Sequence, residues 1–449
     1  MYDVLIIGAG TAGIAAAKQL EKLNAKYLLI EEGDGSTTCA KTGCMPSKGL
    51  IEIAKKVNNI QSLTKDNLIQ QNHFKVDTAS VLRKVRALRD HFVERTIRGS
   101  EEFPRIKGHA SFVDTNTLEV NGEKISANNI IIASGSRPRI PDVFEEVKSS
   151  ILTTDNFFEQ ETLPDSIAVV GLGIVGVELA QALARLGVQV QVYEEYKTIA
   201  GIQDEKVFHH ALSIQQQYYP IHFNTKIAKV TKQAGQFLIE WESGQSITDQ
   251  VLLCAGRESN IDQLNLEKLG LDTTDTANTL YDPCTLQIND FPIYVAGDAS
   301  SKKMVVHEAA EEARVAVYNA MHAKKKRLAK PALNIVFTDP PIARVGQSLS
   351  ELDQEKCVIG EFEFSLQGRA TLKGENHGVV RVYVHSENHH ILGAEMMAPG
   401  ADNFAHLLMM AIQNEIPLHG LLQLPVYHPV LEEGLRQALV NVKSKSAVT

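Results

Sequence analysis

One short pattern occurs twice in this sequence, and it constrains the fold more than any other feature. The first copy begins at Tyr2 with YDVLIIGAGTAG, and the second begins at Ser166 with SIAVVGLGIVG. Each is an apolar, β-branched run that enters Gly-x-Gly-x-x-Gly and is followed by a helical stretch rich in alanine and leucine. A second apolar run then ends in an acidic residue, 23 residues after the first glycine in both copies. This order predicts two βαβ units, each in a parallel sheet.

Each position of the pattern has its own physical role. The first glycine allows a tight turn, the second lets the backbone approach a pyrophosphate at the helix N-terminus, and the third lets helix and strand pack closely. The acidic residue accepts hydrogen bonds from a ribose. We therefore predict two dinucleotide sites. Their residues are Gly8, Gly10, Gly13 and Glu31 in the first copy and Gly171, Gly173, Gly176 and Glu194 in the second.

The length of 449 residues suggests about three domains at ~150 residues per domain. We expect an α/β fold with two Rossmann-like dinucleotide-binding domains and a C-terminal α+β domain. The run FPIYVAGDAS, which reaches Asp298, adds a late nucleotide-facing element to the first domain. The expected bounds are 1–145 and 266–330 for the first nucleotide domain, 146–265 for the second and 331–449 for the C-terminal domain.

The C-terminal region differs in pattern from the rest of the chain. Three runs, VFTDPPIARVG, GVVRVYVH and ILGAEMMAPG, predict strands of an antiparallel sheet. They alternate with helices expected near 402–414 and 429–442. Residues 50–100 also show apolar spacing of three and four, which predicts helices, and residues 110–132 predict short strands.

Composition excludes several classes of protein. A content of 44% hydrophobic and 22% charged residues is typical of a folded globular chain. No apolar run reaches the ~18 residues of a membrane span, so we expect no membrane insertion. The net charge of -9 argues against nucleic-acid binding, and KKKR at 324–327 is interpreted as a solvated face. No signal sequence follows Met1, which favours a cytoplasmic location.

Two of the five cysteines, Cys39 and Cys44, form a close pair. No second Cys or His pair is spaced to complete a zinc site, so we expect a redox pair and no metal. Pro46 favours a helix that begins near Cys44, and a helix N-terminus lowers the pKa of a thiol. Lys48 lies four residues on, on the same helix face. The other three are interpreted as packing or bystander residues: Cys254, Cys284 and Cys357.

Together with VAGD at 295–298 and YHPVLEEG near the C-terminus, these features resemble the flavoprotein pyridine nucleotide–disulfide oxidoreductases over nearly the whole chain. Among them the dihydrolipoamide dehydrogenases look most similar. The family pattern Gly-Gly-Thr-Cys-x4-Cys-x-Pro-Ser-Lys stands here as Ser36-Thr37-Thr38-Cys39 through Lys48. The resemblance implies that the first fingerprint holds FAD and that the second holds a nicotinamide dinucleotide.

The resemblance also implies roles for residues outside the fingerprints. Asp298 would bind the ribityl–phosphate region of FAD, and Ala110 would meet its adenine through the backbone. Lys48 would lie near the reactive flavin nitrogen, paired with Glu178. Gly256 opens Gly256-Arg257-Glu258-Ser259-Asn260, which stands where the family has Gly-Arg-x-Pro-Asn.

In the implied mechanism, substrate thiols reduce the Cys39–Cys44 disulfide, with Cys39 as the outer, interchange thiol. Cys44 passes the electron pair to FAD, from which NAD is reduced. His428 would act as the base and Glu433 would hold its imidazole, in a His-Pro-Thr-x-x-Glu pattern that has Val430 in place of threonine. The family forms homodimers in which this pair serves the disulfide of the other subunit.

Glu194 favours NAD over NADP, because a 2′-phosphate would meet like charge. The substrate stays open, as a small-molecule or lipoyl dithiol or disulfide, in or out of a 2-oxo acid dehydrogenase complex. Ser36-Thr37 and Val426 depart from the family pattern and leave other functions open. These are a glutathione-reductase-like enzyme, another disulfide reductase or a non-catalytic flavin-binding protein. Mercuric reductases and large thioredoxin reductases carry a further C-terminal cysteine pair, which the tail at 441–449 lacks.

Overall fold

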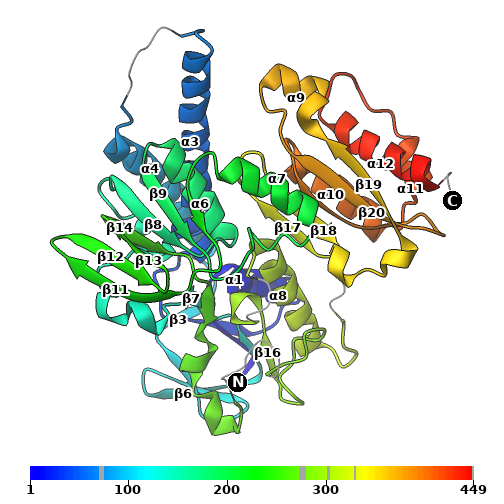
Figure 1. Cartoon of the computed structure of the whole chain (residues 1–449). Helices are drawn as coiled ribbons and strands as arrows, with labels where there is room; N and C mark the ends of the chain where they lie inside the picture. Colours follow the sequence, from blue (N-terminus) through cyan, green and yellow to red (C-terminus); the bar gives the residue numbers. More distant parts are fainter. Residues whose placement is uncertain (70–74, 273–279, 301–303, 328–329, 447–449) are drawn as a thin grey trace.

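The computed structural model describes residues 1–69, 75–272, 280–300, 304–327 and 330–446, so residues 447–449 of the tail discussed above lie outside it. Its main β-sheets are two mainly parallel ones, each with a glycine-rich turn, and one antiparallel sheet near the C-terminus (Figure 1). This arrangement confirms the expected fold class. No helix among the described residues is long and apolar enough to cross a membrane.

The first sheet has the strand order β3-β2-β1-β6-β5-β4, and β16 also pairs with β6. Two separate stretches of chain therefore build one sheet, because β16 follows the whole second nucleotide unit. Its strands are β1 (Tyr2–Ile7), β2 (Tyr27–Glu31), β3 (Arg105–Lys107), β4 (Ala110–Phe112), β5 (Thr117–Val120), β6 (Glu123–Ile132) and β16 (Ile293–Val295).

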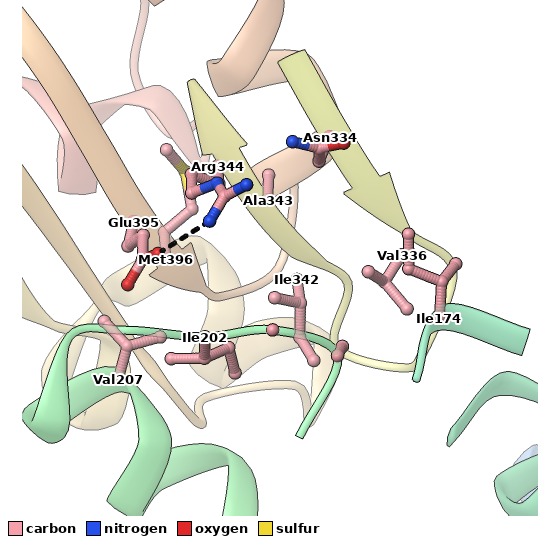
Figure 2. A pocket seen from close by; sticks show the side chains of 12 residues that line it. Ile174, Ile202, Val207, Asn334, Val336, Ile342, Ala343, Arg344, Glu395 and Met396 are labelled. Carbon is pink, nitrogen blue, oxygen red and sulfur yellow. Dashed lines mark ion pairs between the residues drawn. The ribbon is translucent and has the colours of Figure 1, made fainter. Parts of the chain in front are cut away.

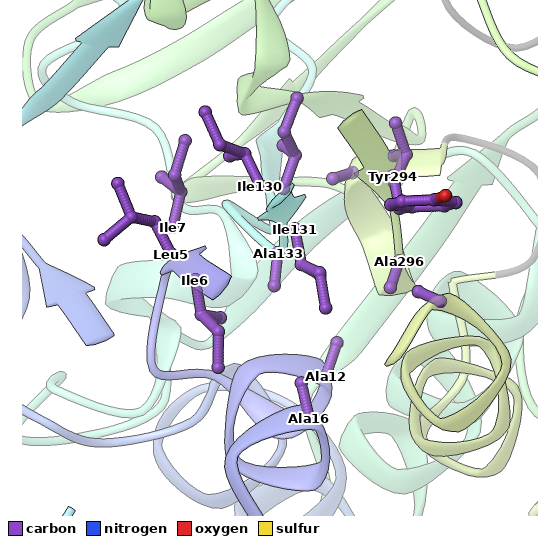
Figure 3. Packing of buried hydrophobic residues seen from close by; sticks show 14 of the residues in the cluster. Leu5, Ile6, Ile7, Ala12, Ala16, Ile130, Ile131, Ala133, Tyr294 and Ala296 are labelled. Atoms are coloured by element: carbon purple, nitrogen blue, oxygen red, sulfur yellow. The ribbon is translucent and has the colours of Figure 1, made fainter. Parts of the chain in front are cut away.

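Small side chains let the first helices approach this sheet closely. Helix α1 (Thr11–Lys22) turns Ala12 and Ala16 toward the branched side chains of β1 and β6, such as Ile6 and Ile131 (Figure 3). Helix α8 (Val306–Met321) packs beside α1. Burial of apolar area at ~25 cal/mol per Å² makes this interior the main stabilising contact of the sheet.

Helices fill the region between β2 and β3, as the apolar spacing predicts. They are α2 (Thr38–Lys41), α3 (Cys44–Lys65) and α4 (Thr78–Arg98), and α3 runs beside α4. Asp77 caps α4, because its side chain accepts a hydrogen bond from the backbone N–H of Ser80. The short α5 (Thr154–Phe157) precedes the second nucleotide unit.

The second parallel sheet has the order β10-β9-β8-β14. A three-stranded antiparallel sheet, β11-β12-β13, adjoins it and was not predicted from the sequence. A two-stranded ribbon of β7 and β15 links the two nucleotide units. The elements are β7 (Ser136–Pro138), β8 (Ser166–Val170), α6 (Ile174–Arg185), β9 (Gln189–Tyr193), α7 (Glu205–Gln215), β10 (Ile221–His222), β11 (Ile227–Gln233), β12 (Gln236–Trp241), β13 (Gly244–Thr248), β14 (Gln250–Leu253) and β15 (Arg257–Ser259).

The C-terminal sheet is antiparallel, with the order β17-β18-β21-β20-β19. The three predicted strand regions are confirmed, whereas β19 was not predicted. The elements are β17 (Leu333–Val336), β18 (Ile342–Gly346), β19 (Cys357–Glu363), α9 (Gly368–Lys373), β20 (Val379–His385), β21 (Ile391–Met397), α10 (Ala401–Gln413), α11 (Leu418–Leu422) and α12 (Glu432–Ser446).

One predicted helix boundary in this domain is wrong. The helix expected from residue 429 begins at Glu432, so Pro429 lies before it. The carboxylate of Glu433 accepts a hydrogen bond from the backbone N–H of Val430 and another contact from His428. These contacts fix the bend at residues 428–429 that precedes the helix.

Candidate active site

In the first glycine-rich turn, two glycines are required by close packing and the remaining one borders open space. A Cβ on Gly8 would overlap the carbonyl oxygen of Ala133, and one on Gly13 would overlap the carbonyl oxygen of Gly8. A Cβ on Gly10 would meet no atom within 4 Å. Two glycines therefore permit packing within the protein, and the middle one faces open space before the first turn of α1. That space suits a phosphate group, which the unpaired N–H groups of a helix N-terminus attract.

The second turn repeats this division of roles. A Cβ on Gly171 would press on the carbonyl of Cys254, and one on Gly176 would overlap the carbonyl oxygen of Gly171. Again nothing lies within 4 Å of the Cβ position of Gly173, and α6 begins at the next residue. The same geometry at both turns fits a dinucleotide at each.

The described polar residues near the first turn include one ion pair and two buried atoms without a hydrogen-bond partner. Glu31 ends β2, is 9% exposed and lies 3.4 Å from Nη1 of Arg105. Among the described side chains, Nη2 of Arg105 and Oγ of Ser134 are buried without a hydrogen-bond partner. Buried polar atoms are nearly always paired. Orphaned donors beside an open glycine turn therefore fit the polar groups of FAD.

Two further residues assigned to the first site lie at its edge. Ala110 begins β4 and is buried. Asp298 accepts a hydrogen bond of 2.8 Å from Oγ of Ser136. Arg257 in turn donates to both Oγ and the backbone oxygen of Ser136, at 2.7 Å each. Arg257 follows Gly256, which has a φ of 95° and open space at its Cβ position.

The path from Gly256 through Arg257 and Ser136 to Asp298 thus connects the ends of the two nucleotide units. The sequence pattern includes Arg257 but predicts no contact for it, and it does not identify Ser136 as a site residue. Their pairing depends on the β7–β15 ribbon, which joins residues more than a hundred positions apart.

Glu194 lies directly after β9, beside the second glycine turn. Its two carboxylate oxygens accept hydrogen bonds from the backbone N–H groups of Leu172 at 2.6 Å and Tyr196 at 3.1 Å. The side chain is 8% exposed. The buried carboxylate of Glu194 is therefore held in place beside the second glycine turn, next to the position expected for a ribose.

Cys44 opens α3, as the sequence predicts, and Cys39 lies in the short helix α2, which was not predicted. Both are free thiols. The hydrogen bond from Cys39, with the positive charge of Lys48 adding to it and burial opposing it, lowers the pKa of Cys44 to about 7. The same hydrogen bond and burial raise the pKa of Cys39. Within the pair, Cys44 is therefore the thiol that loses its proton first.

Lys48 joins the two nucleotide units through an ion pair. Its Nζ lies 2.6 Å from Oε2 of Glu178 on α6, whose side chain is 2% exposed. The other carboxylate oxygen accepts the backbone N–H of Phe337 at 2.8 Å. Nζ also lies 4.8 Å from the centre of the Phe337 ring, within cation–π range. The predicted pairing of Lys48 with Glu178 is thus present in the structure.

The candidate base stands apart from the cysteines. Nδ1 of His428 lies 2.9 Å from Oε1 of Glu433, and this contact lowers the pKa of the glutamate. The His428 side chain is 80% exposed. The segment between α11 and α12, which carries it, lies well away from α3 (Figure 1). One chain therefore brings together the thiols, Lys48 and Glu178, and separately the His428–Glu433 pair.

A small cavity of about 90 Å³ lies where the second nucleotide unit meets the C-terminal sheet. Ile174, the first residue of α6, contributes to its apolar wall, and Arg344 and Glu395, 4.0 Å apart, stand at one end (Figure 2). Buried Glu395 also accepts the backbone N–H groups of Gln203 and Asp204. The cavity therefore adjoins the second glycine turn, and no residue of α3 lines it.

Two glycine substitutions should separate binding from folding. Gly173→Ala should leave the melting temperature within about 2 °C of wild type, because its Cβ meets nothing, yet raise the Kd for NADH at least tenfold by filling the open space. Gly176→Ala should destabilise by about 1–3 kcal/mol through overpacking. Thermal melts and NADH titration measure both. Equal effects of the two variants would contradict these roles.

The thiolate can be tested by alkylation of the reduced protein at different pH values. The rate at Cys44, followed by peptide mass spectrometry, should rise through a midpoint near pH 7. Lys48→Gln should move this midpoint up, because a stabilising positive charge is lost. Glu178→Gln should move it down, because a nearby negative charge is lost while the amide oxygen can still accept the hydrogen bond from Lys48. Two shifts of the same sign would contradict the arrangement.

Comparison with known proteins places these sites in a family. Residues 2–313 match the pyridine nucleotide-disulphide oxidoreductase model, and residues 333–439 match the dimerisation domain of the same family. A dihydrolipoyl dehydrogenase of Chlamydia pneumoniae is 29% identical, with 96% of this chain and 95% of that protein covered. A mercuric reductase of Staphylococcus aureus is 27% identical, with 98% and 82% covered.

Solved structures show the same fold. The HOCl-induced flavoprotein disulfide reductase RclA from Escherichia coli superposes with a TM-score of 0.85 at 21% identity, covering 99% of each chain. LpdA from Mycobacterium tuberculosis gives 0.85 at 22% identity, covering 98% of this chain and 99% of that one. With the family model spanning residues 2–313, the chain belongs to the pyridine nucleotide-disulphide oxidoreductases, FAD-containing enzymes that use NAD(P) and carry a dimerisation domain.

Proposed function

We propose that this oxidoreductase oxidises a dithiol of the dihydrolipoyl type and transfers the electrons to NAD. The balanced reaction is dithiol plus NAD⁺ giving disulfide, NADH and a proton. The observation that carries the proposal is the polarised Cys39–Cys44 pair, with Cys44 at the head of α3, four residues before Lys48. FAD, when bound, supplies the passage of an electron pair from thiol to nicotinamide.

The two cysteines divide the thiol chemistry. Cys39 is the interchange thiol that attacks or receives the substrate sulfur, and its raised pKa keeps it protonated in the resting reduced pair. Cys44 holds the thiolate, which the positive charge of Lys48 stabilises. Thiol exchange requires a thiolate on the attacking sulfur. A base must therefore take a proton from the substrate dithiol during the reaction.

His428 is our candidate for that base. Glu433 orients its imidazole through Nδ1, which leaves Nε2 for the substrate. Because His428 is exposed and lies away from the thiols of its own chain, we infer that it serves the disulfide of a partner subunit in a homodimer. Exposed apolar side chains on α10, Leu407 and Met410, are available for such an interface.

We infer that NAD is preferred to NADP. The shielded carboxylate of Glu194 would accept hydrogen bonds from a ribose and repel a 2′-phosphate. The lipoyl group could be presented free or by a 2-oxo acid dehydrogenase complex. The mercuric reductase relatives raise metal-ion reduction as a second candidate, which the substrate panel distinguishes from thiol oxidation.

A panel of substrates tests the proposed function. We expect kcat/KM for dihydrolipoamide with NAD⁺, and for lipoamide with NADH, to exceed that for glutathione disulfide, coenzyme A disulfide and cystine by at least tenfold. NADH should exceed NADPH by a similar factor. Mercuric and cupric ions complete the panel. A higher rate with a metal ion or another disulfide would overturn the lipoyl assignment.

Mixed dimers test the shared site. Cys44→Ser and His428→Ala should each be inactive as homodimers. In a heterodimer with shared sites, one site collects both defects and the other has none, so about half of wild-type activity per dimer should return. If His428 served its own chain, every site would carry one defect. Zero recovery in verified heterodimers would therefore contradict the model.

A further inference from the structure

Residues 337–339, the first part of the turn between β17 and β18, join three parts of the molecule. It belongs to the C-terminal sheet, yet its main contacts are with α6 of the second nucleotide unit and α3 of the first. Its first residue, Phe337, supplies the backbone N–H that holds one oxygen of the Glu178 carboxylate. The turn thus contacts the ion pair between Lys48 and Glu178 directly.

Asp339 anchors this turn by charge. Its Oδ2 lies 2.9 Å from Nη1 of Arg185, whose side chain is 4% exposed, and its Oδ1 lies 3.2 Å from Nζ of Lys55 on α3. A buried guanidinium is costly unless an opposite charge faces it. Loss of the Asp339–Arg185 contact would therefore leave the Arg185 guanidinium buried without this opposite charge.

Backbone hydrogen bonds add direction to the anchor. The side chain of Gln181 accepts the N–H of Asp339 at 2.8 Å and donates to its carbonyl oxygen at 3.1 Å. Arg185 also donates to that oxygen at 3.2 Å. Glu178, Gln181 and Arg185 are spaced three and four apart, so they share one face of α6. That single face holds both ends of the turn.

The consequence for the active site follows from this shared face. The Glu178 carboxylate is fixed on one side by Lys48 and on the other by the N–H of Phe337, and the position of Phe337 depends on the anchor two residues later. We propose that Asp339 is a positioning residue for the Lys48–Glu178 pair and, through that pair, for the thiolate of Cys44. The proposal rests on the roles of Lys48 and Cys44 given above.

Positioning and direct electrostatics predict opposite signs, which makes the proposal testable. The groups that act on the Cys44 thiol are Cys39 from α2, Lys48 from its own helix and Glu178 from α6. Loss of the Asp339 charge acting only through space would stabilise the thiolate and lower its pKa. Loss of the anchor would loosen Lys48, weaken its attraction for the thiolate and raise the pKa.

The test is the alkylation midpoint of Cys44 in the reduced holoenzyme. Asp339→Asn should raise it by about half a pH unit or more, in the same direction as Lys48→Gln, and Asp339→Glu should shift it less. Glu375→Gln is the control, because it removes the other carboxylate partner of Lys55, 3.6 Å away, without touching α6. It should leave the midpoint unchanged.

An unchanged or lowered midpoint in Asp339→Asn would overturn the proposal. If that variant does not fold, Gln181→Leu decides by the same criterion, because it removes two hydrogen bonds to the turn without changing charge. No disulfide substrate enters the measurement. A wrong assignment of the lipoyl substrate would therefore leave the result intact, and failure of the anchor would leave the substrate panel intact.

Discussion

The ion pair between Lys48 and Glu178 is the contact on which the arrangement of the active site depends. It joins a helix of the first nucleotide unit to the fingerprint helix of the second, and it buries the glutamate almost completely. A buried carboxylate must be fully paired, and here Lys48 and the N–H of Phe337 pair it. This ion pair therefore helps to fix α3, which begins at Cys44, relative to α6, which begins at the second glycine turn.

Steric contact at the glycines supplies the second constraint. In each unit, the first and third glycines lie so close to a neighbouring carbonyl that no side chain fits, and only the middle glycine faces open space. The turn is thus determined by packing within the protein. The same packing requirement explains why the two units share their glycine spacing although they are 163 residues apart.

Local features of the site could be predicted from the residues, and the long-range Lys48–Glu178 pairing was predicted from the family resemblance. Other long-range contacts could not be predicted. The helix N-terminus at Cys44 follows from Pro46 and from apolar spacing, which act over a few residues. Two elements were not predicted because their patterns are weak: the antiparallel sheet β11-β12-β13 and strand β19. The start of α12 was placed too early, because it depends on the contacts of Glu433. The contacts of Asp339 with α6 bridge more than 150 residues, and no pattern in one sequence marks them.

Electron transfer and proton transfer have different structural requirements in this chain. The thiols, Lys48 and Glu178 lie together and half-buried or buried, where charges act strongly on one another. The candidate base, His428, is held by one carboxylate on an exposed segment of the C-terminal domain, well away from α3. Under the proposed function, changes in that segment would alter which disulfide is accepted without disturbing the buried pair. The fold therefore permits relatives with different substrates to keep one electron path.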